Sequence, residues 1–135
     1  MSVPLLLKPL PVEEARLKNP LALAFVGDTV WDLLTRQRLL HSAARVNALH
    51  KQAVAQVNAG AQAQASKRIE QVLTPEEWEM LRRGQNAHAK HATPKNQDPV
   101  AYSCATGLET LMGYLYLSGQ NERIIELFDI GATIP

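Results

Sequence analysis

Two carboxylates in apolar surroundings are the residues of this sequence best suited to chemistry. Asp28 lies in the stretch LALAFVGDTVWDLL, residues 21–34, whose apolar residues follow helical spacing and should therefore face a core. Glu109 is the only formal charge in a second apolar segment, PVAYSCATGLETLMGYLYL, residues 99–117. An ionised carboxylate in such surroundings is costly unless a basic side chain, hydrogen-bond donors or a metal ion neutralises it.

The chemistry that this pair suits is metal binding. If the two segments pack against each other, Asp28 and Glu109 meet and can bind Mg²⁺ through oxygen, with water completing the coordination. The alternative is a pair of buried carboxylates satisfied by capping donors or by a nearby arginine. Asp32 lies one helical turn after Asp28 and is a weaker candidate, either an outer neighbour of the site or an exposed side chain.

A basic and polar segment, residues 82–100, is the second candidate for function. It is broken by Gly84, Pro94 and Pro99, and we expect one long loop here, a kind of segment that often carries function. Its polar side chains are either solvated surface or contacts to RNA phosphates. The candidate RNA-binding residues are Arg82, Arg83, Gln85, Asn86, His88, Lys90, Lys95 and Asn96.

Charge is unevenly distributed along the chain, although the net charge is only +1. Residues 36–97 contain ten Lys and Arg against four Asp and Glu, whereas the two flanks together contain four against nine, so the middle carries +6 and the flanks −5. A basic surface beside an acidic site suits a polyanion that is held by one and processed at the other.

Helices must position these groups, because no strand candidate of useful length is present. Asn19 and Pro20 suit the N-cap and first residue of a long helix, Thr74 to Glu77 form a capping box, and Asp98 precedes the Glu109 helix. The sequence predicts an all-α bundle of about six to seven helices: 11–18, 20–40, two within 43–72 that meet near Gly60, one from Pro75 through Leu81, 99–117, and a short one from Asn121.

Length and composition favour one globular domain over residues 1–135. The chain is 46% apolar and 20% charged, which is typical of folded rather than disordered proteins. The single Cys104 cannot form an internal disulfide, so a cytoplasmic location is the simplest expectation. The N-terminus is a poor signal peptide, and Glu109 near the centre of the most apolar segment argues against a membrane span.

Three pieces of the sequence resemble one family. The GD step of AFVGDTVWDLL, the block LRRGQNAHAKHATPKNQDPVAY and the ATGLETLMGYLYLSG segment together resemble Mini-ribonuclease III, the branch of the ribonuclease III family without a double-stranded RNA-binding domain. The resemblance runs from about Asn19 to Gly119. Each piece alone is weak, but the three in this order and spacing are fairly specific.

The resemblance implies an all-helical catalytic domain, a homodimer, and Mg²⁺-dependent hydrolysis of double-stranded RNA to 5′-phosphate and 3′-hydroxyl ends. It further implies a role in maturing the ends of the large (23S) ribosomal RNA, for which a ribosomal protein is a candidate partner. Asp28 matches the metal-binding aspartate and Glu109 the metal-binding glutamate of the family. Phe25 matches an aromatic that inserts into the partner subunit, although core packing is its other interpretation.

Two positions depart from the pattern of the larger ribonuclease III enzymes. Ala24 stands where those enzymes have a glutamate, and Thr106 stands where they have an aspartate. Because this chain has fewer candidate carboxylates than those enzymes, the number of metal ions per site stays open. The same two positions also support a second hypothesis, a catalytically weak RNA-binding or scaffold protein of the same fold. A third is a helical adaptor that binds no nucleic acid.

Overall fold

The structure, a computed structural model, describes residues 8–41, 45–88 and 95–133, with only the backbone described at residue 88. In this part of the chain it contains α-helices and one 3-10 turn but no strand, so the all-α prediction is confirmed. The elements are α1 (Val12–Arg16), α2 (Pro20–Leu39), α3 (Val46–Val57), α4 (Ala59–Ile69), the turn η1 (Glu70–Val72), α5 (Pro75–His88), α6 (Pro99–Leu117) and α7 (Asn121–Gly131).

The helix starts follow the local signals of the sequence. Asn19 caps α2 by accepting a hydrogen bond from the backbone N–H of Leu21 at 2.8 Å. The capping box at α5 is complete, because the Thr74 hydroxyl accepts from the N–H of Glu77 and the Glu77 carboxylate accepts from the N–H of Thr74. The α3 and α4 helices meet at Asn58, which caps α4 through Ala61, so the break precedes the predicted Gly60 by two residues.

The expected long loop after residue 81 was partly wrong. Helix α5 continues through Gly84 to His88, which places Arg82, Arg83, Gln85 and Asn86 on a helix. Gly84 permits the close approach of α6. A Cβ at this position would lie 2.3 Å from Thr110 Oγ1 and 2.8 Å from the Cα of Gly107, both on α6. Lys90 lies outside the described residues.

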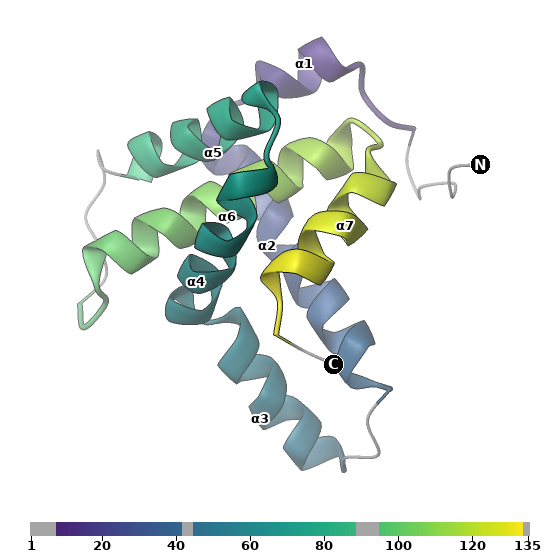
Figure 1. Cartoon of the computed structure of the whole chain (residues 1–135), viewed down its shortest axis with the longest axis vertical. Helices are drawn as coiled ribbons and strands as arrows, with labels where there is room; N and C mark the ends of the chain where they lie inside the picture. The colour runs from purple at the N-terminus through teal and green to yellow at the C-terminus, as the bar shows by residue number, and fades with distance from the viewer. Residues whose placement is uncertain (1–7, 42–44, 89–94, 134–135) are drawn as a thin grey trace.

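Helix α6 is the centre of the bundle. In Figure 1 it crosses the middle of the molecule and packs against α2, α4, α5 and α7, while α3 extends below and contacts α2 and α4. Its Leu108, Leu111, Met112 and Leu115 are fully buried. None of the described helices, α6 included, is long and apolar enough to cross a membrane.

The two longest helices, α2 and α6, touch through their backbones. A Cβ on Gly27 would lie 1.7 Å from the carbonyl oxygen of Glu109, and a Cβ on Gly113 would lie 1.9 Å from the carbonyl oxygen of Leu23. Only glycine permits so close an approach at these two positions. The contact at Gly27 brings the next residue, Asp28, to the level of Glu109 on the neighbouring helix.

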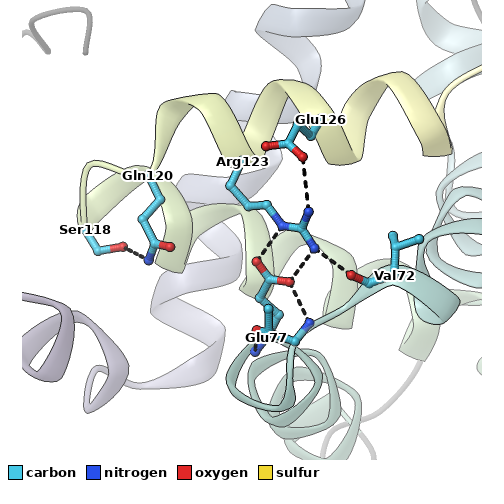
Figure 2. Close-up of polar contacts among 7 residues, drawn as sticks. Val72, Glu77, Ser118, Gln120, Arg123 and Glu126 are labelled. Atoms are coloured by element: carbon cyan, nitrogen blue, oxygen red, sulfur yellow. Dashed lines mark hydrogen bonds and ion pairs between the residues drawn. The ribbon is translucent and has the colours of Figure 1, made fainter. Parts of the chain in front are cut away.

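A largely buried ion pair joins α7 to the start of α5. Figure 2 shows Arg123 of α7 bonded through Nε and Nη2 to both carboxylate oxygens of Glu77, at 2.8 and 2.9 Å, and to the carbonyl oxygen of Val72 at 2.6 Å. Burial alone would raise the pKa of Glu77, but the hydrogen bonds and charge of Arg123, with the N–H of Thr74, lower it overall. The pair therefore fixes α7 to the start of α5.

The glycine contact generates a stability prediction. Gly27→Ala places a methyl group on a backbone carbonyl that cannot move independently of α6, so we expect it to lower the free energy of unfolding by at least about 3 kcal/mol in urea titrations. Gly60→Ala is the matched control, because its Cβ meets only Asn58 Oδ1 at 3.4 Å. We expect the control to be neutral or stabilising by about 1 kcal/mol. Equal stability of the two variants would contradict the packing argument.

Candidate active site

A pocket of about 320 Å³ lies beside α6 and contains both predicted carboxylates. Helix α2 contributes Asp28, α6 contributes Glu109 and its neighbours, and the third wall is the α3–α4 junction together with α4. The other lining residues are Val57, Asn58, Ala59, Gln62, Gln97, Tyr102, Ala105 and Thr106. Apart from the two carboxylates, the polar groups of the wall are amides and hydroxyls.

Asp28 and Glu109 converge, and their side chains hydrogen-bond to each other. Glu109 is half-buried, as the apolar sequence around it predicted. Asp28 is exposed although it stands among apolar residues in the sequence, so the alternative of two buried carboxylates does not hold for it. The buried residues of α2, among them Leu23, Gly27 and Trp31, lie on another side of the helix. Metal binding by the pair stays a prediction.

The proximity of the two carboxyls raises the pKa of Glu109. Burial, the hydrogen bond that the protonated Glu109 carboxyl donates to Asp28, and the charge of Asp28 together raise the pKa of Glu109 to about 8, and the nearby Gln62 amide opposes them. No Lys or Arg forms an ion pair with Glu109 among the residues that the structure describes. In the absence of a cation, the pair therefore holds a proton around neutral pH, and a divalent cation would satisfy the same excess of acceptor oxygens.

The donor set is small but chemically consistent with Mg²⁺. Ala24 and Thr106 are both buried at 7% exposure, and the Thr106 hydroxyl donates to the carbonyl oxygen of Tyr102 at 2.9 Å. No group of three or more His, Cys, Asp or Glu side chains suited to a metal occurs among the described residues. Two carboxylates remain in a pocket lined by amide and hydroxyl side chains, and oxygen is the donor that Mg²⁺ prefers.

Asp32, the third carboxylate considered, is engaged elsewhere. It accepts a hydrogen bond from Nε of Arg36 at 2.9 Å, one turn along α2, and it is not part of the pocket wall. The alternative in which Asp32 is a surface residue is therefore the one that the geometry favours.

None of the described candidate RNA-binding residues lines the pocket, although Asn96 directly precedes Gln97, which does. Arg82 and Asn86 are exposed and Gln85 is half-buried on α5, while Lys95 and Asn96 are exposed just before α6. Arg83 donates to the backbone carbonyls of Arg16 and Lys18, so its guanidinium ties α5 to the end of α1. The side chain of His88 and all of Lys90 lie outside the described residues. Their contact with RNA stays a prediction.

Phe25 is 81% exposed on α2. Its alternative role as a core residue is therefore excluded within this chain. Leu33 on α2 and Leu40 at its C-cap are also exposed, at 63% and 70%, and helical spacing places them on the same side as Phe25. Leu33 and Leu40 also line a pocket with Val46 and Leu49 of α3.

Sequence reasoning missed the amides of the pocket. Gln62, Asn58 and Gln97 line it beside the carboxylates. Only Asn58 had a recognisable local signal, as an N-cap. Gln62 lies in the run AGAQAQASK, where Gln62 and Gln64 look alike, and only the fold separates the buried glutamine from the exposed one.

Comparisons with known proteins identify similar sequences and a similar structure. The profile of the Ribonuclease III domain matches residues 21–120. A Mini-ribonuclease 3 from Symbiobacterium thermophilum is 44% identical over 114 residues, 84% of this chain and 87% of that protein. One from a Thermoanaerobacter species is 42% identical over 117 residues, 86% of this chain and 82% of that protein. A crystal structure of a Fusobacterium nucleatum protein superposes with a TM-score of 0.77 at 31% identity, covering 87% of this chain and 93% of that one.

The raised pKa of Glu109 predicts how stability depends on pH in the presence of a chelator. Between the ordinary carboxyl value of 4.5 and about 8, the folded protein keeps a proton that the unfolded chain has released. The free energy of unfolding should therefore fall as pH rises through this window, by up to about 1.4 kcal/mol per pH unit from this group. Urea unfolding from pH 5 to 9 should show a shallower decline for Glu109→Gln. Identical pH profiles for variant and wild type would contradict the coupling.

Proposed function

This chain belongs to the ribonuclease III family and is an endoribonuclease that acts on double-stranded RNA, and we propose that it does so with Mg²⁺ held by Asp28 and Glu109. The observation that carries the proposal is the convergence of these two carboxyls in one pocket with no basic partner for Glu109 among the described residues. Such an uncompensated pair costs stability and is typical of functional sites.

The two carboxylates of the pocket have defined parts in this mechanism. Bound Mg²⁺ supplies an activated water and neutralises charge that develops on the scissile phosphate. The exposed Asp28 of α2 and the half-buried Glu109 of α6 would hold the cation. Hydrolysis of the phosphodiester would leave 5′-phosphate and 3′-hydroxyl ends.

Substrate recognition is proposed to rest on shape and phosphate contacts. A-form RNA hides its base edges in a deep groove, so a protein reads its phosphates and 2′-hydroxyls. Arg82 and Asn86 on α5 and Lys95 and Asn96 before α6 are exposed and suited to such contacts. The precursor of large-subunit (23S) ribosomal RNA in the cytoplasm is the proposed natural substrate, with a ribosomal protein as candidate partner.

The exposed apolar side of α2 supports a homodimer. Phe25 and Leu33 on α2 and Leu40 at its C-cap are large apolar side chains that a monomer leaves in water. Two copies that bury this surface against each other would present two pockets, one for each strand of a duplex.

A second candidate function is an RNA-binding scaffold with little cleavage activity. Ala24 and Thr106 favour it, because both replace carboxylates of the larger enzymes with buried side chains that cannot bind a cation through a charge. Two remaining carboxylates still provide the usual number of protein ligands for Mg²⁺ that keeps several waters, so the nuclease remains the favoured function.

Cleavage of a long RNA duplex tests the metal pair directly. Asp28→Asn keeps the shape of the side chain but removes its charge, so we expect cleavage with Mg²⁺ to fall at least about a hundredfold. Asp32→Asn is the matched control on the same helix, since Asp32 pairs with Arg36 outside the pocket, and it should cleave as wild type does. Fragments are measured on denaturing gels with Mg²⁺, Ca²⁺ or a chelator.

The other outcomes separate the hypotheses. Cleavage that survives Asp28→Asn would refute the proposed mechanism. Duplex binding without any cleavage by the wild type would favour the scaffold. Binding should weaken steeply as salt increases, because phosphate contacts release counterions; no affinity for RNA at low salt would leave only the helical adaptor.

The dimer is tested by Phe25→Glu, which places a charge in the apolar contact. We expect sedimentation velocity to show a shift from dimer towards monomer, with helicity unchanged because Phe25 is 81% exposed. Ile125→Glu on α7, at 45% exposure, is the control and should stay dimeric. If wild type and both variants sediment alike as monomers, the proposed dimer is wrong.

A further inference from the structure

Gln62 is a buried polar residue with an unusual environment. It lies on α4 at 3% exposure, and its Nε2 has no hydrogen-bond partner within ordinary distance. Buried amide donors are nearly always paired, because an unpaired one loses its hydration without compensation. An unpaired donor that also lines a pocket can pair with a group that becomes a stronger acceptor when a ligand binds there.

The position of Gln62 indicates which group that would be. Four described side chains have a buried polar atom without a partner: Trp31, Thr35, Gln62 and Ser66. Of these only Gln62 lines the pocket of Asp28 and Glu109. The other three are buried and do not line this pocket.

Gln62 and Glu109 line the same pocket from two helices that pack against each other, Gln62 from α4 and Glu109 from α6. Nε2 of Gln62 makes no hydrogen bond of ordinary length. The pocket therefore holds a buried amide donor without an acceptor together with a carboxylate that can accept.

A bound cation would change the group with which the Glu109 carboxylate can pair. A carboxylate that binds a metal through one oxygen commonly accepts a hydrogen bond on the other, and this second contact fixes its orientation. Once a cation replaces the proton between Asp28 and Glu109, the Glu109 carboxylate is a charged acceptor facing a buried donor that cannot turn to water. Charge-assisted bonds of this kind are about twice as strong as neutral ones.

We propose that Gln62 is a positioning residue of the nuclease site, whose side-chain amide donates to Glu109 and orients that carboxylate to bind the divalent cation. The inference rests on the proposed function, because it takes Asp28 and Glu109 as the cation ligands. Gln62 acts through Glu109 and needs no contact with RNA.

Calorimetric titration of Mn²⁺ into the cation-free protein measures this role without turnover. Gln62→Met keeps the length of the side chain and removes the donor, so we expect Mn²⁺ affinity to fall about tenfold. Gln64→Met is the matched control, because Gln64 is exposed two residues away on the same helix, and it should bind Mn²⁺ as wild type does. RNA cleavage by Gln62→Met should show a reduced kcat at limiting Mg²⁺, an unchanged KM for RNA, and recovery at saturating Mg²⁺.

Thermal unfolding in chelator separates this role from a structural one. Replacing an unpaired buried donor with an apolar group of the same length should leave the unfolding midpoint unchanged or higher. A lower midpoint together with wild-type Mn²⁺ affinity would show that Gln62 serves folding only, and would overturn the proposal. If Gln62→Met does not fold, Gln62→Asn, whose amide is one methylene too short, takes its place and should also weaken Mn²⁺ binding; wild-type affinity in it would overturn the proposal.

Titration of the wild-type protein distinguishes failure of the proposed metal site from failure of the proposed role of Gln62. No Mn²⁺ binding by wild-type protein would refute the metal pair, and with it the role of Gln62. Binding by wild type that Asp28→Asn abolishes and Gln62→Met leaves unchanged would refute only the role of Gln62.

Discussion

The backbone contact between α2 and α6 is the constraint on which the site depends. Gly27 and Gly113 leave no room for a Cβ, since each Cβ would lie within 2 Å of a carbonyl oxygen on the facing helix, at 1.7 and 1.9 Å. This approach sets Asp28 beside Glu109. A larger separation of the helices would leave two isolated carboxyls, neither of which could share a cation with the other.

Two glutamates of this bundle show how the same side chain serves stability or chemistry. Glu77 is almost fully buried, yet the Arg123 guanidinium and the Thr74 N–H lower its pKa, so it remains ionised and joins α5 to α7. Glu109 faces Asp28 instead of a guanidinium, and its pKa rises to about 8. The charge of Glu77 is neutralised by a partner within the fold. The charge of Glu109 has no such partner among the described residues and would be neutralised by a ligand, a situation that is common for functional groups.

The exposed residues proposed to contact RNA do not themselves line the pocket of Asp28 and Glu109. Helix α5 packs its Gly84 against α6 on one side and presents Arg82 and Asn86 to solvent on another, so the same helix supports the core and offers polar contacts. Arg83, between them, is used to hold the end of α1 through two backbone carbonyls. Adjacent arginines thus differ in role because successive residues of a helix point about 100° apart.

Local sequence determined the helices and the pair of carboxylates, because caps, proline positions and apolar spacing act over a few residues. Asn19, the Thr74 capping box and Asp98 begin helices as expected, and Asp28 and Glu109 stood out as charges among apolar neighbours. Only the tertiary structure decided that Gly84 lies within a helix, that Asp28 is exposed, and that Gln62 rather than Gln64 faces the pocket. These outcomes depend on which helix packs against which, and no residue carries that information without its distant neighbours.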